Sequence, residues 1–137
     1  EKEIATLRQA QLLAQAGSLV AQASDVDGVK VLAHDAGAVA STDELRTLAL
    51  DLRERLGGSA VVAIGGVTKD RPALVVATSP EARDAGVRAG EIVRHLTQVL
   101  GGKGGGRDDV AQGGGSDASL LPQALEALEG VVRQVKA

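Results

Sequence analysis

The chain has 137 residues, a length that suits one domain with a buried core. Its formal net charge is −3, from 15 basic and 18 acidic residues, which argues against a generally basic nucleic-acid-binding protein. It contains no Phe, Trp, Tyr, Met or Cys. These absences exclude base stacking on aromatic side chains, disulfide bonds, thiolate chemistry and Cys-based zinc sites. The core must therefore be built from Leu, Val, Ile and Ala.

Three classes of partner are not expected from the sequence. No segment reaches the roughly 20 apolar residues of a membrane span, so we expect no membrane partner. The only histidines are His34 and His95, and no carboxylate lies at metal-ligand spacing from either. We therefore expect no metal, no cofactor and no catalytic site in this chain. The lack of cysteine is compatible with a reducing cytoplasm, where we expect the protein to act.

The N-terminal segment 3–23 is rich in Ala, Gln and Leu and is predicted to be a helix. Apolar residues spaced by seven, such as Leu12 and Leu19, form a stripe along one side. Two interpretations stay open: a helix packed on its own domain, or the end of a longer helical arm that pairs with another subunit. We divide the chain into an arm, 1–24, and a globular domain, 25–137.

A turn, a strand and a capped helix follow. Residues 25–28 have the composition of a turn, and 29–34 that of a strand. Ser41 and Glu44 form a predicted capping box, in which the Ser41 hydroxyl accepts from the third helical N–H. Regularly spaced leucines continue the helix until Gly57 ends it.

Two wholly apolar runs, 60–64 and 73–77, are typical of strands covered on both faces. Their short connection predicts an antiparallel hairpin, and the strand over 29–34 should lie parallel to one of the pair. Ser79 is a predicted cap with Pro80 at the first helical position.

Two amphipathic helices complete the pattern. One covers 89–100, and the other covers 121–135, with Pro122 in its first turn if Ser119 caps it. The element order predicts an α/β domain: a small mixed β-sheet covered by helices and preceded by the N-terminal helix.

Between these two helices lies the glycine-rich stretch 101–115, with the sequence GGKGGGRDDVAQGGG. It is predicted to be a loop, because glycine weakens helices and strands. A flexible linker is one interpretation. The other is an ordered loop whose backbone donors, beside Lys103 and Arg107, hold phosphate or ribose groups. No Gly-Lys-Ser/Thr opens the next helix, so it is not a P-loop.

This stretch resembles the glycine motif of the C-terminal, DHH-associated domain (C-Ala) of alanyl-tRNA synthetases. Two upstream stretches agree with the family: Val-Thr-Lys-Asp around Lys69, and Ala-Gly-Glu-Ile-Val over 89–93. The resemblance covers most of residues 28–137. The sequence departs from the usual motif at Asp108, where Pro is common, and at Val110, where Met is common. Asp108 adds a negative charge beside Arg107.

The resemblance implies an accessory domain that binds tRNA(Ala) and links aminoacylation with editing in an alanine–tRNA ligase, without a catalytic site in this chain. Backbone, Lys and Arg would contact phosphates and riboses. The alternatives are a dimerisation module acting through residues 3–23 and the substrate-binding half of a DHH-type phosphoesterase, although the Asp-His-His signature is missing. Arg71 is a further basic candidate beside Lys69. The candidate RNA-binding residues are Lys69, Arg88, Arg94, Gly101, Gly102, Lys103, Gly104, Gly105, Gly106, Arg107, Gln112, Gly113 and Gly114.

Overall fold

The computed structural model describes residues 23–26, 28–39, 41–68, 71–102, 104–115 and 118–135. The predicted N-terminal helix, except its last residue, and the candidate residues Lys69 and Lys103 lie outside these ranges. In chain order the elements are β1 (Ser24–Val26), β2 (Val29–Ala38), α2 (Thr42–Leu56), β3 (Ala60–Thr68), β4 (Arg71–Thr78), α3 (Pro80–Asp84), α4 (Ala89–Val99), β5 (Gly104–Gly106), β6 (Val110–Gly114), the 3₁₀ turn η1 (Ala118–Leu120), α5 (Leu121–Glu126) and α6 (Leu128–Val135).

The six strands form one mixed sheet in the order β1-β2-β3-β4-β6-β5. Among the described strands, β2 and β3 are parallel, and the other neighbours are antiparallel. The predicted α/β class, the β3–β4 hairpin and the parallel placement of β2 are confirmed. The two apolar runs became the central strands β3 and β4, which extend a few residues beyond them.

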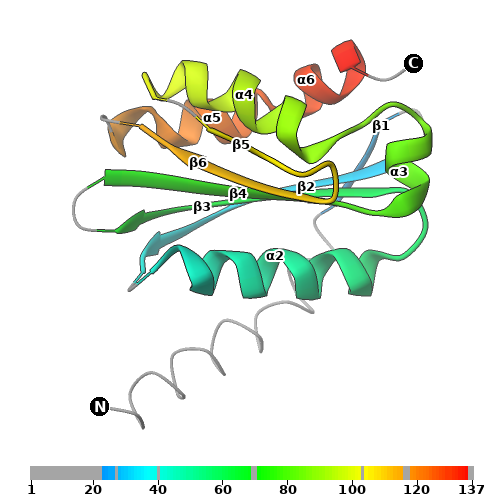
Figure 1. Cartoon of the computed structure of the whole chain (residues 1–137), viewed down its shortest axis with the longest axis horizontal. Coiled ribbons are helices and arrows are strands. Elements are labelled where there is room, and N and C mark those ends of the chain that lie inside the picture. Colours follow the sequence, from blue (N-terminus) through cyan, green and yellow to red (C-terminus); the bar gives the residue numbers. More distant parts are fainter. Residues whose placement is uncertain are drawn as a thin grey trace, which may run out of the picture.

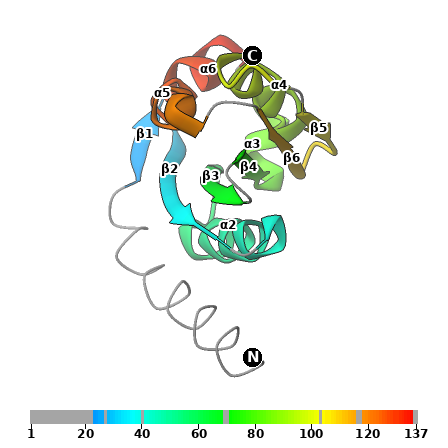
Figure 2. The same ribbon diagram turned by 90° about the vertical axis from the view of Figure 1, so that its left-hand side faces the viewer.

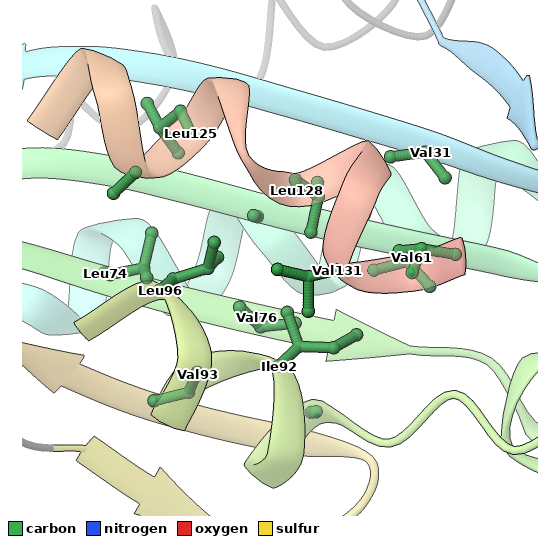
Figure 3. Close-up of a cluster of buried hydrophobic side chains, with 14 of the residues drawn as sticks. Val31, Val61, Leu74, Val76, Ile92, Val93, Leu96, Leu125, Leu128 and Val131 are labelled. Atoms are coloured by element: carbon green, nitrogen blue, oxygen red, sulfur yellow. The ribbon is translucent and has the colours of Figure 1, made fainter. Parts of the chain in front are cut away.

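Helices cover both faces of the sheet (Figures 1 and 2). Helix α2 lies on one face, and α4, α5 and α6 lie on the other. Each face has its own aliphatic core, and Figure 3 shows the core beneath α4–α6. Under α2 the core includes Leu32, Leu45, Leu48, Leu52, Val62, Ile64 and Val75. Under α4–α6 it includes Val31, Val61, Leu74, Val76, Ile92, Leu96, Leu128 and Val132.

Glycines in β3 let the helices approach the sheet closely. A Cβ atom at Gly65 would lie 2.8 Å from Leu121 Cδ1, and one at Gly66 would lie 3.0 Å from Leu45 Cδ2. Both distances are too short for an ordinary contact. Because the sequence has no aromatic residues, this close approach lets small aliphatic side chains fill the space between helix and sheet.

The predicted turn over 25–28 connects a hairpin, because an additional strand, β1, precedes it. Asp25 Oδ1 accepts a hydrogen bond of 2.8 Å from the Gly28 N–H, and Gly28 has φ of 90°. This φ favours glycine. The strand predicted over 29–34 continues as β2 to Ala38.

The N-caps differ from one another. Ser79 caps α3 as predicted, with Pro80 at the helix start, and its Oγ accepts from the Ala82 N–H at 3.3 Å. Ser41 is the N-cap of α2, but its side chain makes no cap hydrogen bond, so this half of the predicted capping box is wrong. The Glu44 N–H donates to the Ser41 carbonyl instead, at 3.3 Å.

The C-terminal region forms two helices instead of the single predicted one. The turn η1 precedes α5, whose N-cap is Leu120 and not Ser119. Pro122 lies in the first turn, where its missing N–H costs nothing. One residue, Ala127, separates α5 from α6, and its N–H still bonds to the Gln123 carbonyl at 3.1 Å. Within the described ranges, no helix is long and apolar enough to span a membrane.

Candidate nucleic-acid interface

The glycine-rich stretch forms a β-hairpin, so its prediction as a loop was wrong (Figure 1). Strand β6 pairs with β4 on one side and with β5 on the other. The register joins Gly113 to Leu74 and Gly104 to Gly113. These ladders satisfy backbone groups that a glycine-rich loop would leave to water, and this offsets the entropy that glycine loses on folding.

Several glycines are required by the packing of the hairpin itself. A Cβ atom at Gly104 would lie 2.4 Å from Val93 Cγ1 of α4, and one at Gly102 would lie 2.0 Å from the Gly114 carbonyl oxygen. Gly105 differs, because a Cβ there meets nothing within 4 Å. Of these three glycines, Gly105 alone presents bare backbone to open space.

The tip of the hairpin is held by its carbonyl groups. The Asp108 carbonyl accepts from the Ala89 N–H at 2.9 Å and from the Thr78 hydroxyl, and the Asp109 carbonyl accepts from the Thr78 N–H at 2.9 Å. The Asp108 carboxylate lies 3.8 Å from Arg88 Nε in an exposed pair. Because main-chain atoms anchor the tip, this position can hold an aspartate where the family usually has proline.

At the opposite end of the hairpin lies a groove of about 530 Å³, here called the glycine groove. It is lined by Thr42, Thr68, Arg71, Pro72, Ala73, Gly101, Gly102, Gly113, Gly114 and Gly115. Both ends of the glycine motif thus meet the β3–β4 hairpin. Lys69 follows Thr68 in the sequence, and Lys103 follows Gly102; neither lysine is among the described residues.

Backbone donors in this groove are already in use. The N–H groups of Gly101, Gly102 and Gly115 donate to the carbonyls of Gln98, Thr97 and Pro72, at 3.3, 2.9 and 3.3 Å. The expected cradle of backbone N–H groups is therefore not formed by these three residues. The glycines instead leave their part of the groove without side chains, so a ligand can approach the main chain there closely.

The predicted basic residues do not form one patch. Arg71 lines the glycine groove, whereas Arg107 lies beyond the other end of β6. The four steps of β4 from Ala73, opposite Gly114, to Ala77, opposite Val110, span about 13 Å. Arg88 is the exposed N-cap of α4, beside the hairpin tip.

Two other candidate residues lie between or beside these ends. Arg94 is exposed on α4, and its Nε donates to the Gly90 carbonyl at 3.3 Å. Gln112 is exposed on β6 and lines a smaller hollow that also includes Arg46 of α2. Arg46 was not among the candidates from the sequence, because nothing in its local pattern shows that the hairpin lies next to α2.

The histidines are not part of the groove. His34 lies on β2, where partial burial lowers its pKa and the neighbouring Asp35 carboxylate opposes that change. Over the described ranges, no group of three or more His, Asp or Glu side chains is arranged to hold a metal ion.

Comparisons with known proteins match both the sequence and the fold. The family model of the DHHA1 domain matches residues 28–134. The alanine–tRNA ligase of Kineococcus radiotolerans is 57% identical over 134 residues, which are 96% of this chain. The chain spans 15% of the length of that relative.

Two solved structures extend the match. The C-Ala domain of Aquifex aeolicus alanyl-tRNA synthetase superposes with a TM-score of 0.72 at 34% identity, covering 80% of this chain and 96% of that domain. A solved DHH domain, from a protein described as a member of a family of ribosomal proteins, has a TM-score of 0.63 at 15% identity, covering 96% of this chain and 32% of that one. This second likeness shows the fold alone.

The family match, the six-stranded sheet and the glycine hairpin together define the class, and the chain belongs to the DHHA1 domain family. The match to the Aquifex domain covers most of both chains, and the Kineococcus ligase is 57% identical. Within the family, the chain is a C-Ala domain, the C-terminal domain of an alanyl-tRNA synthetase.

Proposed function

We propose that this domain binds tRNA(Ala) and holds it for both aminoacylation and editing, which other parts of an alanyl-tRNA synthetase carry out in the cytoplasm. The observation that carries the proposal is the glycine groove. Glycines from both ends of the family motif leave the main chain uncovered there, and Arg71 lines the same groove. The domain itself supplies binding and no catalytic step.

The chemistry of the groove suits an RNA backbone better than RNA bases. There is no aromatic side chain on which a base could stack. Arginine forms paired hydrogen bonds with phosphate, and a surface of bare glycine lets a ribose approach closely. Because the whole chain carries a net charge of −3, binding depends on individual local cations such as Arg71. We therefore expect modest affinity with a steep salt dependence and little base specificity.

A salt series tests the proposal. The 137-residue chain is titrated with transcribed tRNA(Ala) and with an unrelated tRNA at several salt concentrations. Arg71→Ala and the double variant Lys103→Ala/Arg107→Ala should bind several-fold more weakly, with salt slopes lower by about 0.7–0.9 for each phosphate that the variant no longer neutralises. Arg133→Ala on α6 is the control for Arg71→Ala, because it also removes one positive charge, from an exposed position outside the groove.

Each possible result of the salt series leads to a different conclusion. Salt-sensitive binding that Arg71→Ala and the double variant lose and Arg133→Ala retains supports the proposal. Similar affinity for both tRNAs would mean that the domain reads shape and backbone. An absence of binding by the wild-type chain at low salt would contradict it.

A second candidate is a dimerisation module acting through residues 3–23. The observation in its favour is the seven-residue spacing of apolar residues in that segment, which is typical of helices that pair. The two functions are compatible, since one concerns the arm and the other the globular domain.

A further inference from the structure

A second hollow lies next to the glycine groove. It has a volume of about 210 Å³ and is lined by Arg46, Gly105, Gly106, Arg107, Val110, Ala111 and Gln112. The glycine groove takes Thr42 from α2 and Gly114 from β6, and the second hollow takes Arg46 and Gln112 from the same two elements.

The two hollows lie one after the other, each between α2 and β6. Thr42 and Arg46 are one helical turn apart, about 6 Å along α2. Gly114 and Gln112 are two residues apart on β6, about 7 Å, and lie on the same face of the sheet. Because α2 and β6 advance by similar steps, the hollows lie in succession between these two elements, along a line here called the α2–β6 seam.

The charges along the seam are available to a ligand. Within the part of the chain that the structure describes, neither the Arg46 nor the Arg107 side chain makes a hydrogen bond or ion pair, and both residues are exposed. By contrast, Arg55 on the same helix pairs with Asp51, with Nε 2.7 Å from Oδ2.

The aspartates at the hairpin tip have other partners. Asp109 Oδ1 accepts from the Val110 N–H at 3.0 Å, and the Asp108 carboxylate lies 3.8 Å from Arg88 Nε. The second hollow therefore combines two guanidinium groups, the amide of Gln112 and the open backbone at Gly105. These hydrogen-bond donors and positive charges suit a phosphate group and the sugar attached to it.

We propose that the sugar–phosphate backbone of the bound RNA runs along the α2–β6 seam, with one phosphate at Arg71 in the glycine groove and a later one held between Arg46 and Arg107. Arg46 then becomes a binding residue that the glycine motif does not contain. The proposal rests on the proposed function, because it gives the path of an RNA that the domain is proposed to bind.

The test compares Arg46→Ala with Arg55→Ala in the 137-residue chain. Both changes remove one exposed arginine from α2, but the residues are nine positions apart and so lie on opposite flanks of the helix. In titrations with tRNA(Ala) at low salt, we expect Arg46→Ala to weaken binding roughly tenfold and to lower the salt slope by about 0.7–0.9. Arg55→Ala should match the wild type, and Arg46→Lys should fall between, because lysine keeps the charge but loses the planar fork.

A double-variant cycle tests the shared phosphate. If Arg46 and Arg107 hold the same phosphate, the loss in Arg46→Ala/Arg107→Ala will be smaller than the product of the single losses. Circular dichroism melts verify that each variant is folded. If Arg46→Ala binds like Arg55→Ala while Arg71→Ala and Arg107→Ala bind weakly, the seam path is overturned and the proposed function stands. If the wild-type chain does not bind tRNA(Ala) at low salt, both are overturned.

Discussion

Two adjacent glycines in β5 have opposite surroundings. A Cβ atom at Gly104 would lie 2.4 Å from Val93 Cγ1 and 2.9 Å from the Gly113 Cα, whereas one at Gly105 would meet nothing within 4 Å. We expect Gly104→Ala to destabilise the domain by about 1–3 kcal/mol through overpacking. Gly105→Ala should change the free energy of unfolding by less than about 0.5 kcal/mol. Urea denaturation followed by circular dichroism measures both.

The same pair separates packing from RNA contact. Gly105 lines the second hollow, so a methyl group there stands where the proposed ligand approaches. Gly105→Ala should therefore weaken tRNA(Ala) binding in a protein of nearly wild-type stability. Equal destabilisation by the two substitutions would show that β5 is packed differently from this description.

Asp108 gives a prediction about charge alone. Its carboxylate is exposed and lies 3.8 Å from Arg88 Nε, so the pair contributes little to stability. Asp108→Asn keeps the carbonyl that anchors the hairpin tip and removes a negative charge next to Arg107. We expect a change of less than about 0.5 kcal/mol in the free energy of unfolding, and tighter tRNA(Ala) binding at low salt. Tm measurements and a salt series test these two expectations, and weaker binding would contradict the second.

At the scale of the elements, the two serine N-caps are a matched pair. Ser79 Oγ is buried and accepts from the N–H groups of Ala60, at 2.8 Å, and Ala82, at 3.3 Å. It therefore joins the start of β3 to the start of α3. Ser41 caps α2 without a side-chain hydrogen bond to the helix.

We expect Ser79→Ala to cost about 1–3 kcal/mol, because it leaves a buried N–H without its acceptor. Ser41→Ala should cost less than about 0.5 kcal/mol. Chemical denaturation of the two variants measures the difference. A large loss in Ser41→Ala would indicate that its hydroxyl caps the helix in solution.

The central elements were predictable from the sequence because the pattern of their apolar side chains indicates the type of element and its burial. Strands β3 and β4 are covered on both faces and read as continuous apolar runs, and the leucines of α2 recur at helical spacing. The short strand β1 was missed, because three residues ending in a turn carry no alternation. The C-terminal helix was predicted as one, although Ala127 divides it.

The glycine hairpin was not predictable from its own residues. Composition alone cannot distinguish a glycine linker from a strand whose missing side chains make room for α4. That difference depends on Val93 and Thr97 of α4, which lie against Gly104, and on β4, which pairs with β6. For the same reason, the sequence motif pointed to Arg107 but not to Arg46, which joins it only through the folding of α2 beside the hairpin.

At the scale of the whole molecule, the described residues after 22 build a six-stranded sheet with an aliphatic core on each face. We therefore expect a variant lacking residues 1–22 to unfold cooperatively and to keep its affinity for tRNA(Ala). If the arm pairs two subunits, sedimentation of the complete chain should show a mass that rises with concentration, and the shortened variant should be monomeric at all concentrations. A shortened variant that still dimerises would place the interface on the globular domain.

Strand β5 is paired with a neighbour on one side only, so we expect the hairpin to open locally more easily than the centre of the sheet. Strands β3 and β4 are buried between two helical layers, whereas β5 of the hairpin is an edge strand, and Gly105 and Gly106 are exposed. Segments with little buried surface open at lower free-energy cost than the core. The hairpin amides should accordingly exchange with solvent well before those of the central strands. A ligand that bound only the closed hairpin would restrict these openings, so that binding and local order would be thermodynamically linked.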